Sequence, residues 1–126
     1  MAQQTESQLH ESVCNYIRLQ YPHALFNSDM SGIKLTMGQA IKAKKLRSSK
    51  GFPDLVIYES RRGYSALFVE LKKEGEKLYK KDGFTPRTPH LLEQWNMLQD
   101  LEERWFSAQF AVGFDEAKTI IDYYFN

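Results

Sequence analysis

The residues best suited to chemistry in this sequence lie at the ends of two apolar runs. Asp54 opens the run 54–58, while Glu70 and Lys72 stand two residues apart around the end of the run 65–71. Side chains alternate along a strand, so Glu70 and Lys72 share a face, with α-carbons roughly 6 to 7 Å apart. If the two runs pair as a hairpin, the start of the first lies beside the end of the second. The sequence therefore predicts two carboxylates and a lysine at one edge of a sheet.

This set of side chains is typical of metal-assisted hydrolysis of a phosphodiester. Hard divalent cations such as Mg²⁺ take oxygen ligands, so the predicted ligands are the Asp54 and Glu70 carboxylates and the carbonyl oxygen of Leu71. A protonated Lys72 does not ligate a cation, and it would instead position the attacking water or stabilise charge on the phosphate. The spacing has a second interpretation, because Pro-Asp is common in turns and Glu-x-Lys on a strand is often an exposed ion pair. From spacing alone, both interpretations stay open.

Two polar residues fall on the apolar stripes of expected helices. At 100° per residue, Glu6 lies on the helix face of Leu9, and Gln94 lies on the face of Trp95. A polar side chain on such a face must find partners when it is buried. Three explanations remain: both residues are satisfied structural groups, both lie harmlessly at frayed helix ends, or both reach the carboxylates.

The net charge of +1 conceals a basic middle region. Between Asp29 and Asp54 the chain has six basic residues and no acid, and a second basic stretch, interrupted by acids, follows Glu70. Such a surface binds phosphate backbones, although a solvated basic loop and helix would have the same composition. The residues predicted to contact nucleic acid are Lys34, Lys42, Lys44, Lys45, Arg47, Lys50, Lys73, Lys77, Lys80 and Lys81.

Helices and strands alternate in the expected element order, which predicts an α/β fold. The two runs 54–58 and 65–71 are apolar on both faces, so they are expected to be central strands with structure covering each side of the sheet. The segment 73–87 is polar and charged, and we expect a mobile loop there. The expected elements are a helix capped by Thr5 and ended by Pro22, a strand at 24–27, a helix at 36–47, the two runs, a helix capped by Thr88, a strand at 106–112 and a helix at about 115–124.

The length and composition predict one compact domain over residues 1–126, with 42% hydrophobic and 26% charged residues. The single cysteine, Cys14, cannot form an internal disulfide, residues 1–8 are polar, and the longest wholly apolar run has four residues. We therefore expect a cytosolic protein that does not span a membrane.

The histidines have an ordinary structural interpretation. His10, His23 and His90 show no metal-ligand spacing, and an isolated histidine is usually structural. We therefore expect none of the three to be catalytic.

Together, Glu6, the stretch Gly51-Phe52-Pro53-Asp54, the triplet Glu70-Leu71-Lys72 and Gln94 resemble the PD-(D/E)XK nuclease superfamily. More narrowly, the chain resembles the VRR-NUC family in its small stand-alone form, typical of phages and prophages. The resemblance extends from Glu6 to about Tyr124. One departure is His10, which stands where a glutamine often follows the first-helix glutamate.

The resemblance implies a restriction-endonuclease-like core, with a central mixed β-sheet flanked by helices in the order α-β-α-β-β-α-β-α. It implies a Mg²⁺- or Mn²⁺-dependent endodeoxyribonuclease that acts on branched DNA, such as Holliday junctions, as a homodimer in a bacterial cell or phage-infected host. Its implied catalytic residues are Glu6, Asp54, Glu70, Lys72 and Gln94. The alternatives are a flap or single-strand nicking repair nuclease, a non-catalytic DNA-binding module and a purely structural protein.

Overall fold

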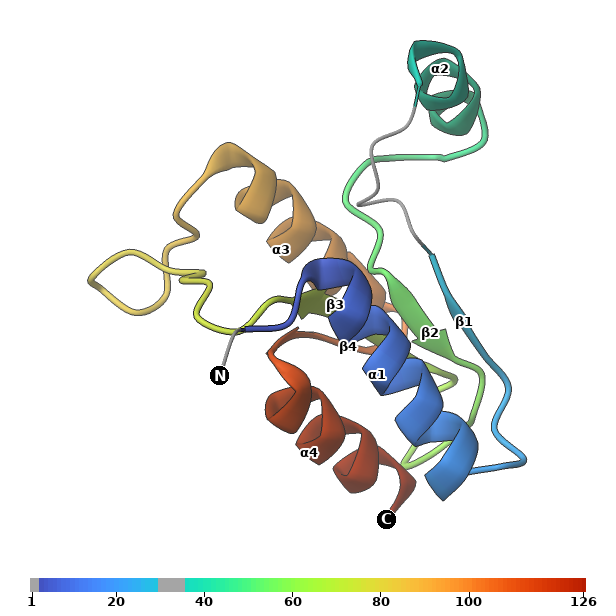
Figure 1. Ribbon diagram of the computed structural model, residues 1–126. Helices are drawn as coiled ribbons and strands as arrows, with labels where there is room; N and C mark the ends of the chain where they lie inside the picture. The colour runs from blue at the N-terminus through green and yellow to red at the C-terminus, as the bar shows by residue number, and fades with distance from the viewer. Residues whose placement is uncertain (1–2, 30–35) are drawn as a thin grey trace.

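The computed structural model describes residues 3–29 and 36–126. Its element order confirms the predicted α/β arrangement (Figure 1). The elements are α1 (Glu6–Gln20), β1 (Phe26–Ser28), α2 (Met37–Lys45), β2 (Leu55–Ile57), β3 (Leu67–Lys72), α3 (Pro89–Glu103), β4 (Ser107–Val112) and α4 (Phe114–Phe125).

The strands form one mixed sheet in the order β1-β2-β3-β4. The β1/β2 and β2/β3 pairs are antiparallel, and β3 pairs with β4 in parallel because α3 carries the chain back between them. The central position of β2 and β3 confirms what their apolar sequences predict. Leu55 lies opposite Val69, and this register places the residue before β2 beside the end of β3.

Helices cover both faces of the sheet, as Figure 1 shows. On one face α1 and α4 pack together, and Leu67, Val69 and Leu71 of β3 point into their apolar core. On the other face Phe68 packs with the apolar side of α3. Period-2 alternation therefore sends Glu70 and Lys72 to the α3 side of the sheet.

Three of the four described helices, α1, α2 and α3, start where the sequence predicts them, because each of these has a threonine cap. Thr5 and Thr36 form capping boxes with Gln8 and Gln39, and the Thr88 hydroxyl accepts a hydrogen bond from the Leu91 N–H. The predicted bounds of the strands and of α2 are less accurate, since each element is shorter or displaced. For example, the expected strand at 24–27 is observed at Phe26–Ser28, where it pairs with β2.

The segment 73–87, predicted to be a mobile loop, contains a hydrogen-bonded hairpin in its second half. Tyr79 bridges Pro86, and the Lys80 N–H donates to the Thr85 carbonyl at 2.8 Å. The Asp82 carboxylate accepts hydrogen bonds from the N–H groups of Phe84 and Thr85, both at 2.9 Å. These bonds close an ordered hairpin whose tip the polar composition alone did not reveal.

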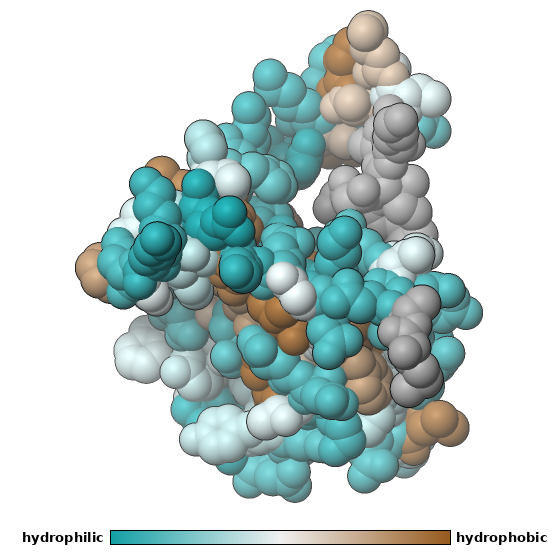
Figure 2. Space-filling view, turned by 60° about the vertical axis from the view of Figure 1, so that its left-hand side comes forward, coloured by the Kyte–Doolittle hydropathy of each residue, from teal (hydrophilic) through white to brown (hydrophobic). Residues whose placement is uncertain are grey.

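Helix α2 differs from the other helices, because none of its described residues is buried. It projects from the body at the top of Figure 1, and Figure 2 shows apolar side chains exposed on this projection. Met37, Ile41 and Leu46 are exposed by 82%, 53% and 78%, respectively. We call residues 36–50 the arm.

No helix among residues 3–29 and 36–126 is both long and apolar enough to cross a bilayer.

Candidate active site

Asp54 lies at the start of β2, and its carboxylate reaches the end of β3. Its side chain is buried, and Oδ2 accepts a hydrogen bond from the Leu71 N–H at 3.2 Å. The Asp54 carbonyl also accepts a hydrogen bond from the Asp29 N–H at 2.6 Å. The hairpin register therefore brings Asp54 to the Glu70-Leu71-Lys72 segment, across a sequence separation of 16 to 18 residues (70 − 54 and 72 − 54).

The segment before Asp54 is held against α3 by a close backbone contact at Gly51. This residue has a φ of +85°, and an added Cβ would lie 2.8 Å from the Glu93 carbonyl oxygen. Any other residue here would have a strained backbone, and its side chain would clash with the backbone of α3. Gly51 thus sets how closely the Asp54 segment approaches the helix that carries Gln94.

Glu70 is almost completely buried and is held by α3. The Gln94 amide Nε2 donates to Glu70 Oε1 at 3.0 Å, while Gln94 Oε1, also buried, has no hydrogen-bond partner among the described residues. Burial raises the pKa of Glu70 to about 10, the Asp54 hydrogen bond and charge act in the same direction, and the Lys72 charge opposes them. The raised pKa of Glu70 therefore reflects its burial first and the neighbouring Asp54 carboxyl second.

All five side chains predicted to be catalytic line one cavity of about 380 Å³, and Arg47 joins them. Lys72 is buried at 8% exposure, and its Nζ lies 3.9 Å from Glu76 Oε2. Of the three explanations for Glu6 and Gln94, the structure favours the third. Gln94 bonds Glu70 directly, and Glu6, although exposed at the first turn of α1, faces the cavity.

The backbone of Leu71 is oriented as the ligand prediction requires. The Leu71 N–H bonds Asp54, whereas the next carbonyl, that of Lys72, accepts from the Gly113 N–H after β4. The N–H and C=O of one extended residue point to the same side of a strand. The Leu71 carbonyl therefore points toward Asp54, the residue just before β2.

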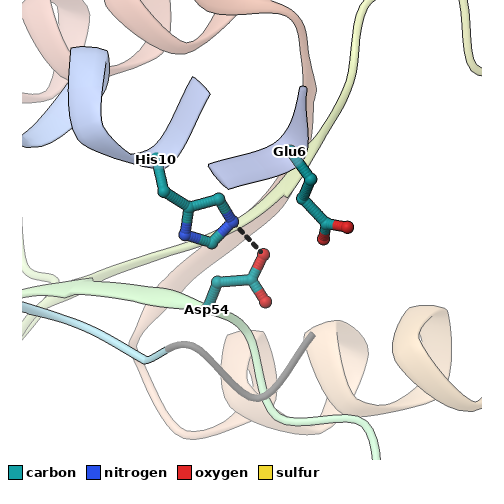
Figure 3. A group of neighbouring side chains, drawn as sticks. All are labelled: Glu6, His10 and Asp54. Atoms are coloured by element: carbon teal, nitrogen blue, oxygen red, sulfur yellow. Dashed lines mark ion pairs between the residues drawn. The ribbon is translucent and has the colours of Figure 1, made fainter. Parts of the chain in front are cut away.

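His10 is the residue that sequence reasoning missed. Its Nε2 lies 3.3 Å from Asp54 Oδ2 and its Nδ1 lies 3.1 Å from Ser28 Oγ. The ligand atoms of Glu6, His10 and Asp54 all lie within 4.8 Å of one another (Figure 3). The spacing of Glu6 and His10, one helical turn apart on one face, was the available signal.

The basic residues predicted to contact DNA occupy two separate places. Lys42, Lys44 and Lys45 lie on α2, with Arg47 and Lys50 following it, and Lys73, Lys77, Lys80 and Lys81 lie between β3 and α3. Lys34 lies outside the described residues. Arg47 alone of these lines the cavity that holds the carboxylates.

The donor set fits a divalent cation. Oxygen atoms around this small polar space come from the Asp54 and Glu70 carboxyls, the Leu71 carbonyl and the Gln94 amide, whose oxygen has no partner among the described residues. A cation bound there would offset the cost of burying two carboxylates near each other.

No known family profile matches this sequence, and no curated protein matches it. Among solved structures, a "VRR_NUC domain protein" superimposes with a TM-score of 0.70 at 24% sequence identity. The alignment covers 98% of this chain and 90% of that chain. The chain has the VRR_NUC fold. This likeness confirms, at the level of the fold, the resemblance that the motifs indicate.

Proposed function

We propose that residues 1–126 form one VRR-NUC nuclease domain, a Mg²⁺- or Mn²⁺-dependent endodeoxyribonuclease. The observation that carries the proposal is the cavity lined by Glu6, Asp54, Glu70, Lys72 and Gln94. The likeness in fold to a VRR_NUC domain protein supports it. An ordinary exposed ion pair would leave Glu70 and Lys72 in solvent, whereas both are buried.

In the proposed mechanism Asp54, Glu70 and the Leu71 carbonyl hold the cation. When bound, the cation lowers the pKa of a water and neutralises charge on the scissile phosphate. Lys72 orients that water and stabilises negative charge on the phosphate oxygens. Gln94 fixes the Glu70 carboxylate through its 3.0 Å hydrogen bond, and Glu6 completes the acidic side of the cavity.

The DNA path in this proposal runs from the arm across the cavity to the ordered hairpin at 78–87. None of the predicted DNA contacts within the described residues forms an ion pair with an acidic side chain, so their charges are available to phosphates. Arg47 connects the arm to the cavity. Lys34, which lies outside the described residues, stays a predicted DNA contact from its sequence alone.

The hairpin tip has the properties of a contact for unpaired bases. Phe84 is 72% exposed, lies close to Lys80 and Lys81 in the sequence, and is presented by the ordered Asp82 turn. Base stacking on an aromatic ring tolerates any sequence, and the neighbouring lysines attract the backbone. These features support branched DNA, with unpaired or splayed bases, as the substrate.

We further propose that the active form is a homodimer that cuts four-way junctions within a bacterial or phage-infected cell. A nine-residue helix is marginal in isolation, and α2 has exposed apolar residues and none buried. Contact with a second copy would cover those residues. A two-fold axis would also place two cavities against opposing strands of a symmetric junction.

The test is metal-dependent cleavage of labelled four-way junction, flap, nicked and linear duplex DNA of matched sequence. We expect Mg²⁺ or Mn²⁺ to give cleavage of the junction, chelation to abolish it, and linear duplex to be a poor substrate. Preference for flap or nicked DNA would replace junction resolution with a repair function. Salt-sensitive binding without a cleaved product would leave a DNA-binding module.

Sedimentation velocity at several protein concentrations tests the dimer. A chain that remains monomeric with and without junction DNA would contradict the two-fold arrangement.

A further inference from the structure

His10 occupies a position that the proposed nuclease chemistry does not explain. It is 6% exposed, and both of its ring nitrogens have oxygen neighbours, Asp54 Oδ2 at 3.3 Å and Ser28 Oγ at 3.1 Å. Figure 3 shows the imidazole of α1 directed at Asp54, with Glu6 one turn earlier facing the same space. Three chain segments, the start of α1, the end of β1 and the start of β2, therefore converge on this ring.

A purely structural histidine would need only the two neighbours that bond its ring. The position of Glu6 is not explained in that way, because its carboxylate makes no hydrogen bond or ion pair among the described residues. It nevertheless lies within 4.8 Å of ligand atoms of both His10 and Asp54. Two carboxylates facing one imidazole nitrogen form a ligand set with one side open to solvent through Glu6.

Ser28 supplies the support that a histidine ligand requires. A ligating imidazole uses one nitrogen for the metal and donates its other N–H to a fixed acceptor, which sets its tautomer and orientation. The Ser28 hydroxyl oxygen lies within hydrogen-bond distance of Nδ1 and accepts its proton in that tautomer. Nε2 is then unprotonated and directed at the space between Glu6 and Asp54.

We propose that Glu6, His10 and Asp54 bind a second divalent cation beside the one assigned to Asp54, Glu70 and Leu71. Asp54 belongs to both sets, since its carboxylate contacts the Leu71 N–H and His10. The imidazole makes this position prefer first-row transition ions such as Mn²⁺ over Mg²⁺, which takes oxygen ligands. This inference rests on the proposed nuclease site, because the two positions share a carboxylate.

The test counts Mn²⁺ ions bound to the metal-free full chain without DNA, by electron paramagnetic resonance of the free ion and by calorimetry. We expect two ions for the wild type and one for His10→Ala. Ser28→Ala keeps the ligand but loses its support, so its second ion should bind 10 to 100-fold more weakly, the range expected for such partners. His23→Ala, at an exposed histidine outside the site, is the control and should bind two.

His10→Gln separates loss of a ligand from loss of the fold. The glutamine oxygen replaces the nitrogen, so we expect two ions to bind but the preference for Mn²⁺ over Mg²⁺ at the second position to fall about tenfold. Circular dichroism establishes that each variant is folded. One bound ion in the wild type, or two equally tight ions in His10→Ala, would overturn the inference.

The outcomes also separate this inference from the proposed function. A wild-type chain that binds two Mn²⁺ ions, one of which requires His10, but cleaves no DNA overturns the nuclease proposal alone. A chain that cleaves junctions with one ion bound, unaffected by His10→Ala, overturns the second site alone.

Discussion

The edge of the sheet where Asp54 meets the end of β3, which we call the edge, and the arm are built in opposite ways. At the edge, Asp54, Glu70, Lys72 and Gln94 are all at most 8% exposed, and hydrogen bonds link strands to α3. In the arm, α2 has no buried residue, and its lysines and apolar side chains face outward. The edge is therefore formed within one chain, whereas the arm leaves its charged and apolar groups exposed.

This contrast separates two parts of the proposed function. The chemistry depends on polar groups whose positions are set by packing, where a small displacement has a large effect. Substrate capture depends on unpaired charges on a projecting helix, where single changes have small and additive effects. Variants in the two regions should differ in both the size and the kind of their effects.

The largest effect is expected from isosteric changes at the edge. Asp54→Asn, Glu70→Gln and Lys72→Met should each lower metal-dependent cleavage on the order of 10³-fold or more, because each removes a charge from the reacting site. Binding of junction DNA, measured by fluorescence anisotropy, should change little. Glu103→Gln, at an exposed carboxylate outside the cavity, is the control. Full activity in any edge variant would remove that residue from the mechanism.

The next largest effect is expected from Gly51→Ala. This substitution should displace the Asp54 segment from α3 without removing any charged group. The new Cβ would lie 2.8 Å from the Glu93 carbonyl at a φ of +85°. We expect a loss of about 1 to 3 kcal/mol in the free energy of unfolding and about 10²-fold in cleavage.

Gly63→Ala is the matched control for that variant. Gly63 has the same φ of +85°, but an added Cβ would meet nothing within 4 Å. It should lose stability through backbone strain and keep its cleavage rate. Equal activity losses in the two variants would show that strain alone, rather than the contact with α3, is responsible.

The arm should respond in affinity only. Changing Lys42, Lys44 and Lys45 together to glutamine should reduce the slope of log affinity against log salt by roughly 3, at about 0.9 for each phosphate that a lysine no longer neutralises. The melting temperature should stay the same, since α2 buries no residue. Arg104→Gln, exposed and outside the predicted DNA surface, should leave the slope unchanged. An unchanged slope in the triple variant would place the DNA elsewhere.

The edge should also give the metal-free protein a pH dependence of stability. Because burial raises the pKa of Glu70 from 4.5 to about 10, its neutral form stabilises the fold fully below about pH 4.5, and this contribution falls as pH rises toward 10. Glu70→Gln stays neutral, so its melting temperature in chelator should exceed that of the wild type increasingly between about pH 6 and pH 9. Parallel melting curves would contradict the raised pKa.

Local signals in the sequence predicted much of this molecule. Three threonine caps set the helix starts, and two apolar runs predicted the central strands. The antiparallel register of those strands then brings Asp54 to Glu70, as the sequence predicts. These features follow from contacts between near neighbours in the chain, for which residue type and spacing are sufficient information.

The place of His10 beside Asp54 and the hairpin at 78–87 were not predicted from the sequence, for related reasons. The partners of His10 are Asp54 and Ser28, 44 and 18 residues away (54 − 10 and 28 − 10), so no local pattern links the three. The hairpin depends on hydrogen bonds that the Asp82 side chain accepts, and its polar composition does not distinguish it from an irregular loop.

The sequence by itself determined the element order and the central strands. It also indicated the residues that are expected to bind a cation and contact a phosphate. Only the tertiary structure decided that Gln94 holds Glu70, that Gly51 lies against α3, and that His10 stands beside Asp54. The physical reason is range: caps and alternation act within a few residues, whereas burial and the desolvation of Glu70 arise only when distant segments pack together.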